Sequence, residues 1–250
     1  MQSASIDEGT RPVATRRRFR RTTRYLGTAL IVGGVLMLAW AFSVWRWEDP
    51  ITGIYAAWEQ RQLDAELSTL IRERPPPPAP KAQEPPSVGV ARSRREARDF
   101  RRGASDGEAI GRLRVPRLGL TIVMVEGTDA ASLRKGPGRD ERTFMPGEGK
   151  LVYVAGHRTT YSAPFARIDS LRPGDRVTLE MPYGTFDYVV ARSRIVDDED
   201  LSVLESGKGE EVALQACHPR FFASQRYIVW ARPVQPLAID GRTYARADHA

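Results

Sequence analysis

The chain has 250 residues, with 38 Lys and Arg against 31 Asp and Glu and a formal net charge of +7 at pH 7. This length allows one domain of ordinary size plus additional segments. The single cysteine, Cys217, excludes a disulfide within the chain. One cysteine and three scattered histidines (His157, His218 and His249) give no ligand spacing for zinc, and no Gly-rich phosphate loop is present. We therefore expect no metal and no other cofactor.

Residues 1–24 are a polar and then strongly basic tail, with no acidic residue between Glu8 and Glu48. Nucleic-acid binding is one interpretation of such an arginine run. However, the next 21 residues, from Tyr25 to Trp45, carry no charge. As a helix they are roughly 30 Å long, which matches the hydrocarbon core of a bilayer. Residues 25–47 are therefore predicted to be a transmembrane anchor, which argues against a nucleic-acid partner.

The arginines before this segment predict that the N-terminus is cytoplasmic and that the rest of the chain lies outside the cell membrane. A cleaved signal peptide is the alternative. We disfavour it because the apolar run is too long for a signal-peptide core, and its Trp-rich end offers no convincing small-residue cleavage site.

Two further segments precede the folded domain. Residues 48–73 have apolar side chains at helical spacing and predict a juxtamembrane amphipathic helix, which lies at the membrane interface or pairs with a copy of itself. Residues 74–103 are rich in Pro and Arg and predict an extended, solvated linker. Contact of its arginines with anionic lipid or cell-wall polymer is the alternative.

Residues 104–234 are predicted to be a mainly β domain, followed by a polar tail at 235–250. Strong alternation and turn signals indicate many short strands and two short helices, which favours a small closed or nearly closed barrel. The expected strands lie near residues 110–115, 120–125, 150–155, 175–181, 185–196, 211–217 and 226–231. The acidic run at residues 197–200 is interpreted as a solvated loop, with Ca²⁺ binding as the alternative.

Cys217 lies at a position where a thiol can act as a nucleophile. Cys217 ends one expected strand, and Arg226 begins the next. If these strands are neighbours, alternation allows the thiol and the guanidinium to meet at one end of the sheet. A thiolate that attacks a carbonyl needs a proton donor or acceptor and a positive charge for the oxyanion. A buried structural thiol is the alternative, which we disfavour because a strand end can be exposed.

The imidazole must come from one of three histidines. His157 follows a strand and a glycine, a place where scaffolds present functional side chains, although a surface turn histidine is the commoner case. His218 adjoins Cys217, and adjacent side chains on a strand diverge. His249 lies in the polar tail and is expected to have no role. His157 is therefore the better partner for Cys217, provided that the fold brings it near.

These residues resemble the sortases, the membrane-anchored cysteine transpeptidases of Gram-positive bacteria. The similarity runs from about Ile110 to Val234 and rests on four motifs. They are Val152-Tyr153-Val154-Ala155-Gly156-His157-Arg158, the run from Phe165 to Val177, Cys217-His218-Pro219, and Arg226-Tyr227-Ile228-Val229. The stretch from Gly156 to Phe165 and the Cys-His-Pro triplet are most similar to class E, a group found in high-GC Actinobacteria. The chain departs from the family pattern at Ala216, where Thr is usual, and we expect this to alter hydrogen bonding beside the substrate.

The resemblance implies a closed eight-stranded β-barrel with short helices, preceded by a single transmembrane helix. It implies that Cys217 attacks the Thr–Gly carbonyl of a C-terminal sorting motif, that His157 transfers the proton, and that Arg226 holds the oxyanion. The expected partners are the membrane, secreted proteins with a sorting signal, and a lipid-linked peptidoglycan precursor that supplies an amine. Class E further implies Leu-Ala-x-Thr-Gly over Leu-Pro-x-Thr-Gly, in a groove between the strand ending at Ala155 and the loop at residues 197–209.

Three other functions remain open. A cysteine hydrolase would use the same residues with water as the acceptor. An L,D-transpeptidase is disfavoured because the Ser-His-Gly-Cys motif usual in that family is absent. A membrane-tethered binding module without catalysis would require an inert Cys217. The acceptor amine, the sorted proteins and a role in pilus assembly are not specified by these motifs.

Overall fold

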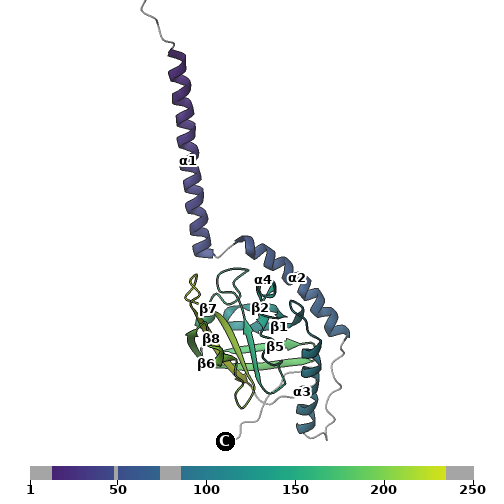
Figure 1. Ribbon diagram of the computed structural model, residues 1–250. Coiled ribbons are helices and arrows are strands. Elements are labelled where there is room, and N and C mark those ends of the chain that lie inside the picture. Colours follow the sequence, from purple (N-terminus) through teal and green to yellow (C-terminus); the bar gives the residue numbers. More distant parts are fainter. Residues whose placement is uncertain (1–12, 48–49, 74–85, 235–250) are drawn as a thin grey trace, which may run out of the picture. The chain divides into compact units, whose positions relative to one another are not determined.

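The computed structural model describes residues 13–47, 50–73 and 86–234, and the chain divides into two compact units, Met1–Trp47 and Glu48–Ala250 (Figure 1). Three predicted features lie outside the described residues. They are the first half of the basic tail, most of the Pro-rich part of the linker, and the polar C-terminal tail with His249.

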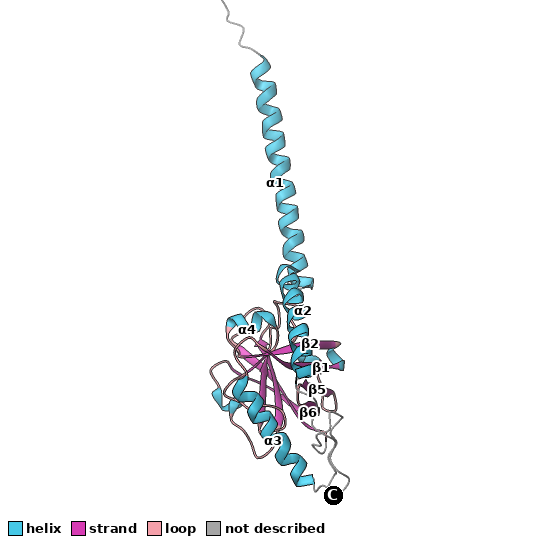
Figure 2. Cartoon of the chain, turned by 90° about the vertical axis from the view of Figure 1, so that its right-hand side faces the viewer, coloured by secondary structure: helices cyan, strands magenta, loops and turns pink. Residues whose placement is uncertain are grey.

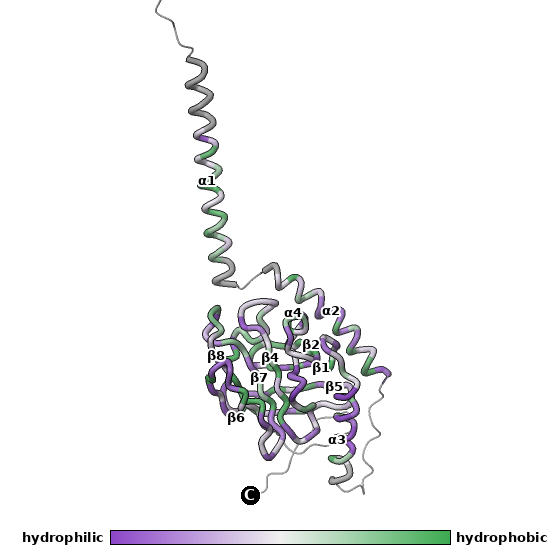
Figure 3. The backbone as a smooth tube through the Cα atoms, in the orientation of Figure 1, coloured by the Kyte–Doolittle hydropathy of each residue, from purple (hydrophilic) through white to green (hydrophobic). Residues whose placement is uncertain are grey.

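The first unit contains one long helix, α1 (Val13–Trp47). Its segment Thr23–Phe42 has a mean hydropathy of 1.9 and none of it is buried within the protein. Figure 3 shows the apolar residues that run along this part of the helix. By length and composition the segment can cross a membrane, as the sequence predicts, although a signal sequence passes the same test.

The second unit is built on a closed barrel with the strand order β1-β2-β3-β4-β7-β8-β6-β5. The β2–β3 and β4–β7 pairs are parallel, and the other pairs are antiparallel. The predicted eight-stranded closed barrel is confirmed. The strands are β1 (Ala109–Val115), β2 (Leu120–Glu126), β3 (Gly138–Arg139), β4 (Leu151–Ala155), β5 (Arg176–Met181), β6 (Gly184–Asp197), β7 (Glu211–His218) and β8 (Gln225–Pro233).

Helical segments join the strands. The short helix α4 (Ala130–Lys135) follows Asp129, whose side chain accepts hydrogen bonds from the N–H groups of Ala131 and Ser132. Asp129 is therefore the N-cap of this helix. Three 3₁₀ turns lie at Pro116–Leu118, Ile168–Ser170 and Leu201–Leu204. The last of these interrupts the connection between β6 and β7, which was expected to be a loop.

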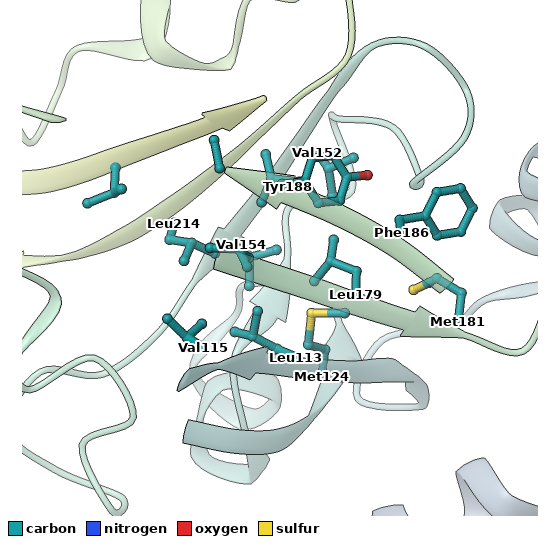
Figure 4. Packing of buried hydrophobic residues seen from close by; sticks show 14 of the residues in the cluster. Leu113, Val115, Met124, Val152, Val154, Leu179, Met181, Phe186, Tyr188 and Leu214 are labelled. Carbon is teal, nitrogen blue, oxygen red and sulfur yellow. The ribbon is translucent and has the colours of Figure 1, made fainter. Parts of the chain in front are cut away.

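Two apolar clusters follow from side-chain alternation along the strands. The larger cluster fills the barrel interior and includes Leu113, Val154, Leu179, Tyr188 and Leu214 (Figure 4). The smaller cluster lies on the other face of β4, β7 and β8, where Val203 and Leu204 of the β6–β7 connection pack against it. Its buried members are Leu151, Tyr153, Val196, Ala213, Ile228 and Trp230. This connection therefore covers the outer face of the sheet beside the end of β7.

Helix α2 (Pro50–Glu73) packs on the barrel within the second unit. Leu63 and Leu67 are buried against the outer face of β1 and β2, where they contact Ala109, Val123 and Val125. Burial of such a side chain contributes about 1.5–3 kcal/mol. The helix has the predicted extent, but the face that carries these leucines covers the barrel, and neither the membrane interface nor a second copy is needed to bury it.

Helix α3 (Pro86–Gly103) corrects the prediction of an extended linker for residues 86–103. Ser93, Ala97 and Phe100 recur at helical spacing and are buried against the barrel, where the Phe100 ring lies 5.4 Å from that of Tyr183. Figure 2 shows α3 running alongside the strands. The sequence did not predict this helix, because arginines on its exposed face dominate the composition and only a narrow stripe of residues is buried.

Gln60 provides a test of how α2 is attached. Its Nε2 donates to the carbonyls of Val123 (3.0 Å) and Lys135 (2.9 Å), and its Oε1 accepts from the Val123 N–H (2.8 Å). Gln60→Ala leaves these main-chain groups unpaired, so we expect the free energy of unfolding to fall by about 1–3 kcal/mol. Urea unfolding of the fragment Glu48–Ala250 measures it. Gln62→Ala, at an exposed position of the same helix, is the control, and equal midpoints for the two variants would contradict the prediction.

Candidate active site

A groove of about 290 Å³ lies on the outer face of the barrel. Its lining includes outward-facing residues of β4, β7 and β8, namely Tyr153, Ala155, Gln215, Cys217 and Arg226. The opposite wall comes from Asp197, the last residue of β6, and from the β6–β7 connection, which contributes Asp198, Asp200, Leu201, Val203 and Leu204. The groove therefore lies where the sequence predicts it, between the end of β4 and this connection.

Cys217 and Arg226 meet as expected, because they are direct partners in the antiparallel pairing of β7 with β8. Side chains that are directly opposite share a face, with Cβ atoms about 4.5–5.5 Å apart. The thiol is partly exposed, and both side chains line the groove. This placement argues against a buried structural cysteine.

The Arg226 guanidinium is fixed by main-chain contacts. Its Nη1 donates to the carbonyls of Ala223 (2.7 Å) and Gln225 (2.9 Å), and its Nη2 lies 3.8 Å from Oδ2 of Asp198. These contacts hold a cation at the edge of the groove beside the thiol. A preorganised cation in this position can stabilise negative charge that develops on a bound carbonyl oxygen.

His157 reaches the same groove from β4. The parallel pairing of β4 with β7 ends with Ala155 opposite Gln215, and the Gly156 N–H adds one more bond to the Gln215 carbonyl at 2.9 Å. His157 and Cys217 lie two residues beyond this last pair, His157 after the end of β4 and Cys217 within β7. The fold thus brings the predicted histidine, cysteine and arginine into the lining of one groove.

The environment of His157 favours the neutral imidazole. Burial lowers the pKa of His157 below its usual value of 6.5, and the nearby Arg134 lowers it further. The ring packs 5.0 Å from that of Tyr161. Within the described part of the chain, the buried Nε2 has no hydrogen-bond partner. His157 also lines the groove, where a neutral imidazole can accept a proton.

The first turns of α2 support the loop that follows His157. Tyr161, Ser162 and Ala163 have positive φ values of 51°, 61° and 38°, a strained conformation for residues other than glycine. The Tyr161 N–H donates to Oγ1 of Thr52 (2.9 Å), and the Tyr55 ring lies 6.3 Å from that of Tyr161. No local pattern in the sequence indicates this contact, because its residues are 109 positions apart.

His218 points elsewhere, as predicted for a neighbour of Cys217 on a strand, and it does not line the groove. Its Nδ1 lies 2.9 Å from Nη1 of Arg158, and its ring is 6.1 Å from that of Tyr227. Because an arginine only donates, Nδ1 is the acceptor in this hydrogen bond.

Ala216 corrects one expectation. Its side chain is fully buried in the cluster inside the barrel, on the opposite face of β7 from Cys217. The methyl group that replaces the usual threonine therefore does not line the groove, and the expected change in hydrogen bonding beside the substrate has no basis in this arrangement.

The acidic run at residues 197–200 contacts protein groups. Asp200 accepts a hydrogen bond from the Ser202 N–H (3.1 Å) and pairs with Arg194 (3.2 Å), while Asp198 lies beside Arg226. Among residues 13–47, 50–73 and 86–234, no three His, Cys, Asp or Glu side chains gather as ligands for a metal ion.

The fold and the groove together define a β-barrel protein with a lone cysteine, a histidine and an arginine gathered at one end of the sheet. The sortase domain family matches residues 113–234. Over these residues the barrel is similar to the sortase domain, which defines a family of cysteine transpeptidases.

Named relatives show the same similarity. Sortase D of Bacillus subtilis (strain 168) is 35% identical over 132 residues, which cover 51% of this chain and 65% of the relative. Sortase SrtE1 of Streptomyces coelicolor is 28% identical over 145 residues, which cover 52% of this chain and 41% of the relative. The chain thus spans less than two thirds of the length of either relative.

A solved structure supports the fold alone. A sortase D5 transpeptidase from Clostridium perfringens superposes with a TM-score of 0.52 at 22% identity, covering 68% of this chain and 99% of that one. Because the relatives carry the names of both class D and class E, the assignment to class E stays a prediction.

Proposed function

We propose that this chain is a transpeptidase that cleaves a sorting motif between Thr and Gly and transfers the protein to an amine. One observation carries the proposal: Cys217 lies directly opposite Arg226 in the β7–β8 pair, and both line one groove with His157. Nucleophile, cation and imidazole are the three groups that acyl transfer through a thiol requires.

In the proposed reaction, the Cys217 thiol passes its proton to the neutral His157 imidazole, Sγ bonds to the Thr carbonyl carbon, and the Arg226 guanidinium stabilises the oxyanion that forms. The C–N bond to Gly then breaks, and His157 gives the departing amine its proton, which leaves a thioester on Cys217. The acceptor amine attacks this thioester while His157 takes the amine proton. The C–S bond breaks and the thiolate is regenerated.

The N-terminal helix supports a role at the membrane. In the proposed topology, α1 crosses the membrane with its basic N-terminus in the cytoplasm, and the catalytic barrel lies outside. The proposed partners are secreted proteins with a C-terminal sorting signal and a lipid-linked peptidoglycan precursor. Because both would arrive at the same membrane face, tethering the enzyme there raises their effective concentration.

The groove also supports a preference within the sorting motif. An Ala before the variable position keeps a main-chain N–H that Pro lacks. The groove wall offers acceptors for that donor, among them the carboxylates of Asp197 and Asp198 and the amide oxygen of Gln215. An unpaired acceptor costs about 1–3 kcal/mol, so we expect kcat/KM to favour Leu-Ala-x-Thr-Gly over Leu-Pro-x-Thr-Gly by about tenfold or more.

The test incubates the full chain in detergent with two peptides that differ only at this position, with and without candidate amines. Mass spectrometry should detect the amine-linked product and a thioester on the protein. Free acid as the sole product, whether or not an amine is present, would indicate a hydrolase. No conversion and no acyl-enzyme would favour a binding module. Equal rates for the two peptides, or a preference for Pro, would refute the class E motif and leave the acyl-transfer chemistry intact.

A further inference from the structure

We propose that Arg158 is a positioning residue. A hydrogen bond from its guanidinium to the Cys217 carbonyl fixes the position of Cys217 relative to His157. This role deepens the proposed function, and its kinetic consequences rest on it. Arg158 directly follows His157 in the chain, yet its side chain bonds to the neighbouring strand.

The bond forms at the point where the backbone ladder ends. In a parallel pair, the residues that donate from one strand alternate along the chain. The Gly156 N–H donates to the Gln215 carbonyl, so the next acceptor along β7 is the carbonyl of Cys217. Nη1 of Arg158 lies 3.2 Å from that oxygen. A side chain thus extends the connection between β4 and β7 by one step beyond their paired residues.

Further contacts hold the guanidinium in place. Nη2 pairs with Oδ2 of Asp169, in the turn at Ile168–Ser170, at 2.7 Å. Nη1 also reaches Nδ1 of His218 at 2.9 Å, and the Tyr227 ring lies 5.8 Å from the guanidinium carbon. The Arg158 side chain is only 3% exposed. Its planar, charged donors therefore join three segments of the chain in one geometry.

This geometry matters because the side chains of His157 and Cys217 belong to different segments past the paired residues. Proton transfer requires heavy atoms within about 2.6–3.2 Å. A misplacement of about 1 Å can lower a rate about 100-fold. A guanidinium that bonds the Cys217 main chain and follows His157 directly limits how far the two can separate.

The experiment compares Arg158→Ala and Arg158→Lys with wild type, using the full chain in detergent. We expect Arg158→Ala to lower kcat about 100-fold and to change KM less than about twofold. Arg158→Lys should fall between these values, since an ammonium group lacks the planar fork. In an NMR titration, the pKa of the His157 imidazole should rise in Arg158→Ala, because a looser segment lets water reach the ring.

Arg167→Ala is the matched control. Its Nη2 also donates to a main-chain carbonyl, that of Leu118 at 3.1 Å, and Arg167 does not line the groove. We expect this variant to keep the wild-type kcat and His157 titration, so a general loss of arginine bonding cannot mimic the effect.

The two measurements separate the proposals. If wild type turns over no peptide, the proposed function fails, and the His157 titration still tests Arg158. Wild-type kcat and titration in Arg158→Ala would overturn the positioning role, as would a higher KM at unchanged kcat. If Arg158→Ala does not fold, Arg158→Lys and Asp169→Asn decide, since the Asp169 side chain is 52% exposed. Both variants must then show a lower kcat, and wild-type values would overturn the role.

Discussion

Cys217→Ala should abolish both turnover and the acyl-enzyme. The chain has no second thiol, so no other side chain can form the thioester. The expected loss is therefore complete, because it removes the covalent step and not only a contribution to its rate. Intact-mass spectrometry after incubation with a sorting-motif peptide measures the acyl-enzyme, and product analysis measures turnover.

Because the chain has a single cysteine, thiol labelling is a specific control for this variant. A peptide that carries a thiol-reactive group should label wild type once, at Cys217, and should not label the variant. Because the thiol is small and partly exposed, Cys217→Ala should keep the urea midpoint of wild type. Turnover by the folded variant, or wild type that resists labelling, would contradict the assignment of Cys217 as the nucleophile.

His157→Ala and Arg226→Ala should each lower kcat/KM by several orders of magnitude. General acid–base catalysis contributes about 10²–10⁴-fold. Loss of a group that stabilises an oxyanion costs about 10²–10³-fold. Both side chains line the groove with Cys217, so each loss acts on the reacting atoms. Steady-state kinetics with the peptide preferred by wild type measures these effects.

His218→Ala is the matched comparison, since it removes an imidazole that is adjacent to Cys217 but outside the groove lining. It should cost much less than His157→Ala. A modest loss is consistent with the contact between His218 and Arg158. If His218 proves as essential as His157, the assignment of the proton-transfer role to His157 is wrong.

Much of the barrel was predictable because strand positions depend on short-range patterns. Alternation and turn residues located β1, β2 and β4 to β8, and the two-residue strand β3 was too short to leave such a pattern. The same alternation placed Cys217 and Arg226 on matching faces of their strands, as the register confirms. It also implies that Ala216 faces the barrel interior, so this correction could have been drawn from the position of Cys217 alone.

Other features depend on contacts between residues that are distant in the chain. Helix α3 was not expected, because an arginine-rich composition outweighed a stripe of three buried residues, Ser93, Ala97 and Phe100. The sequence pattern also did not show which surface buries the leucines of α2. Nor did it show which loop the first turns of α2 support.

The sequence by itself determined the apolar N-terminal helix, the strands, and the choice of Cys217, His157 and Arg226 as candidates. Only the tertiary structure decided that these three share a groove, that α2 and α3 cover the barrel, and that Arg158 bonds the Cys217 carbonyl. Side-chain periodicity encodes which face of an element is buried, and this is a local property. Which element covers that face depends on how the closed barrel brings together segments that are far apart in the chain.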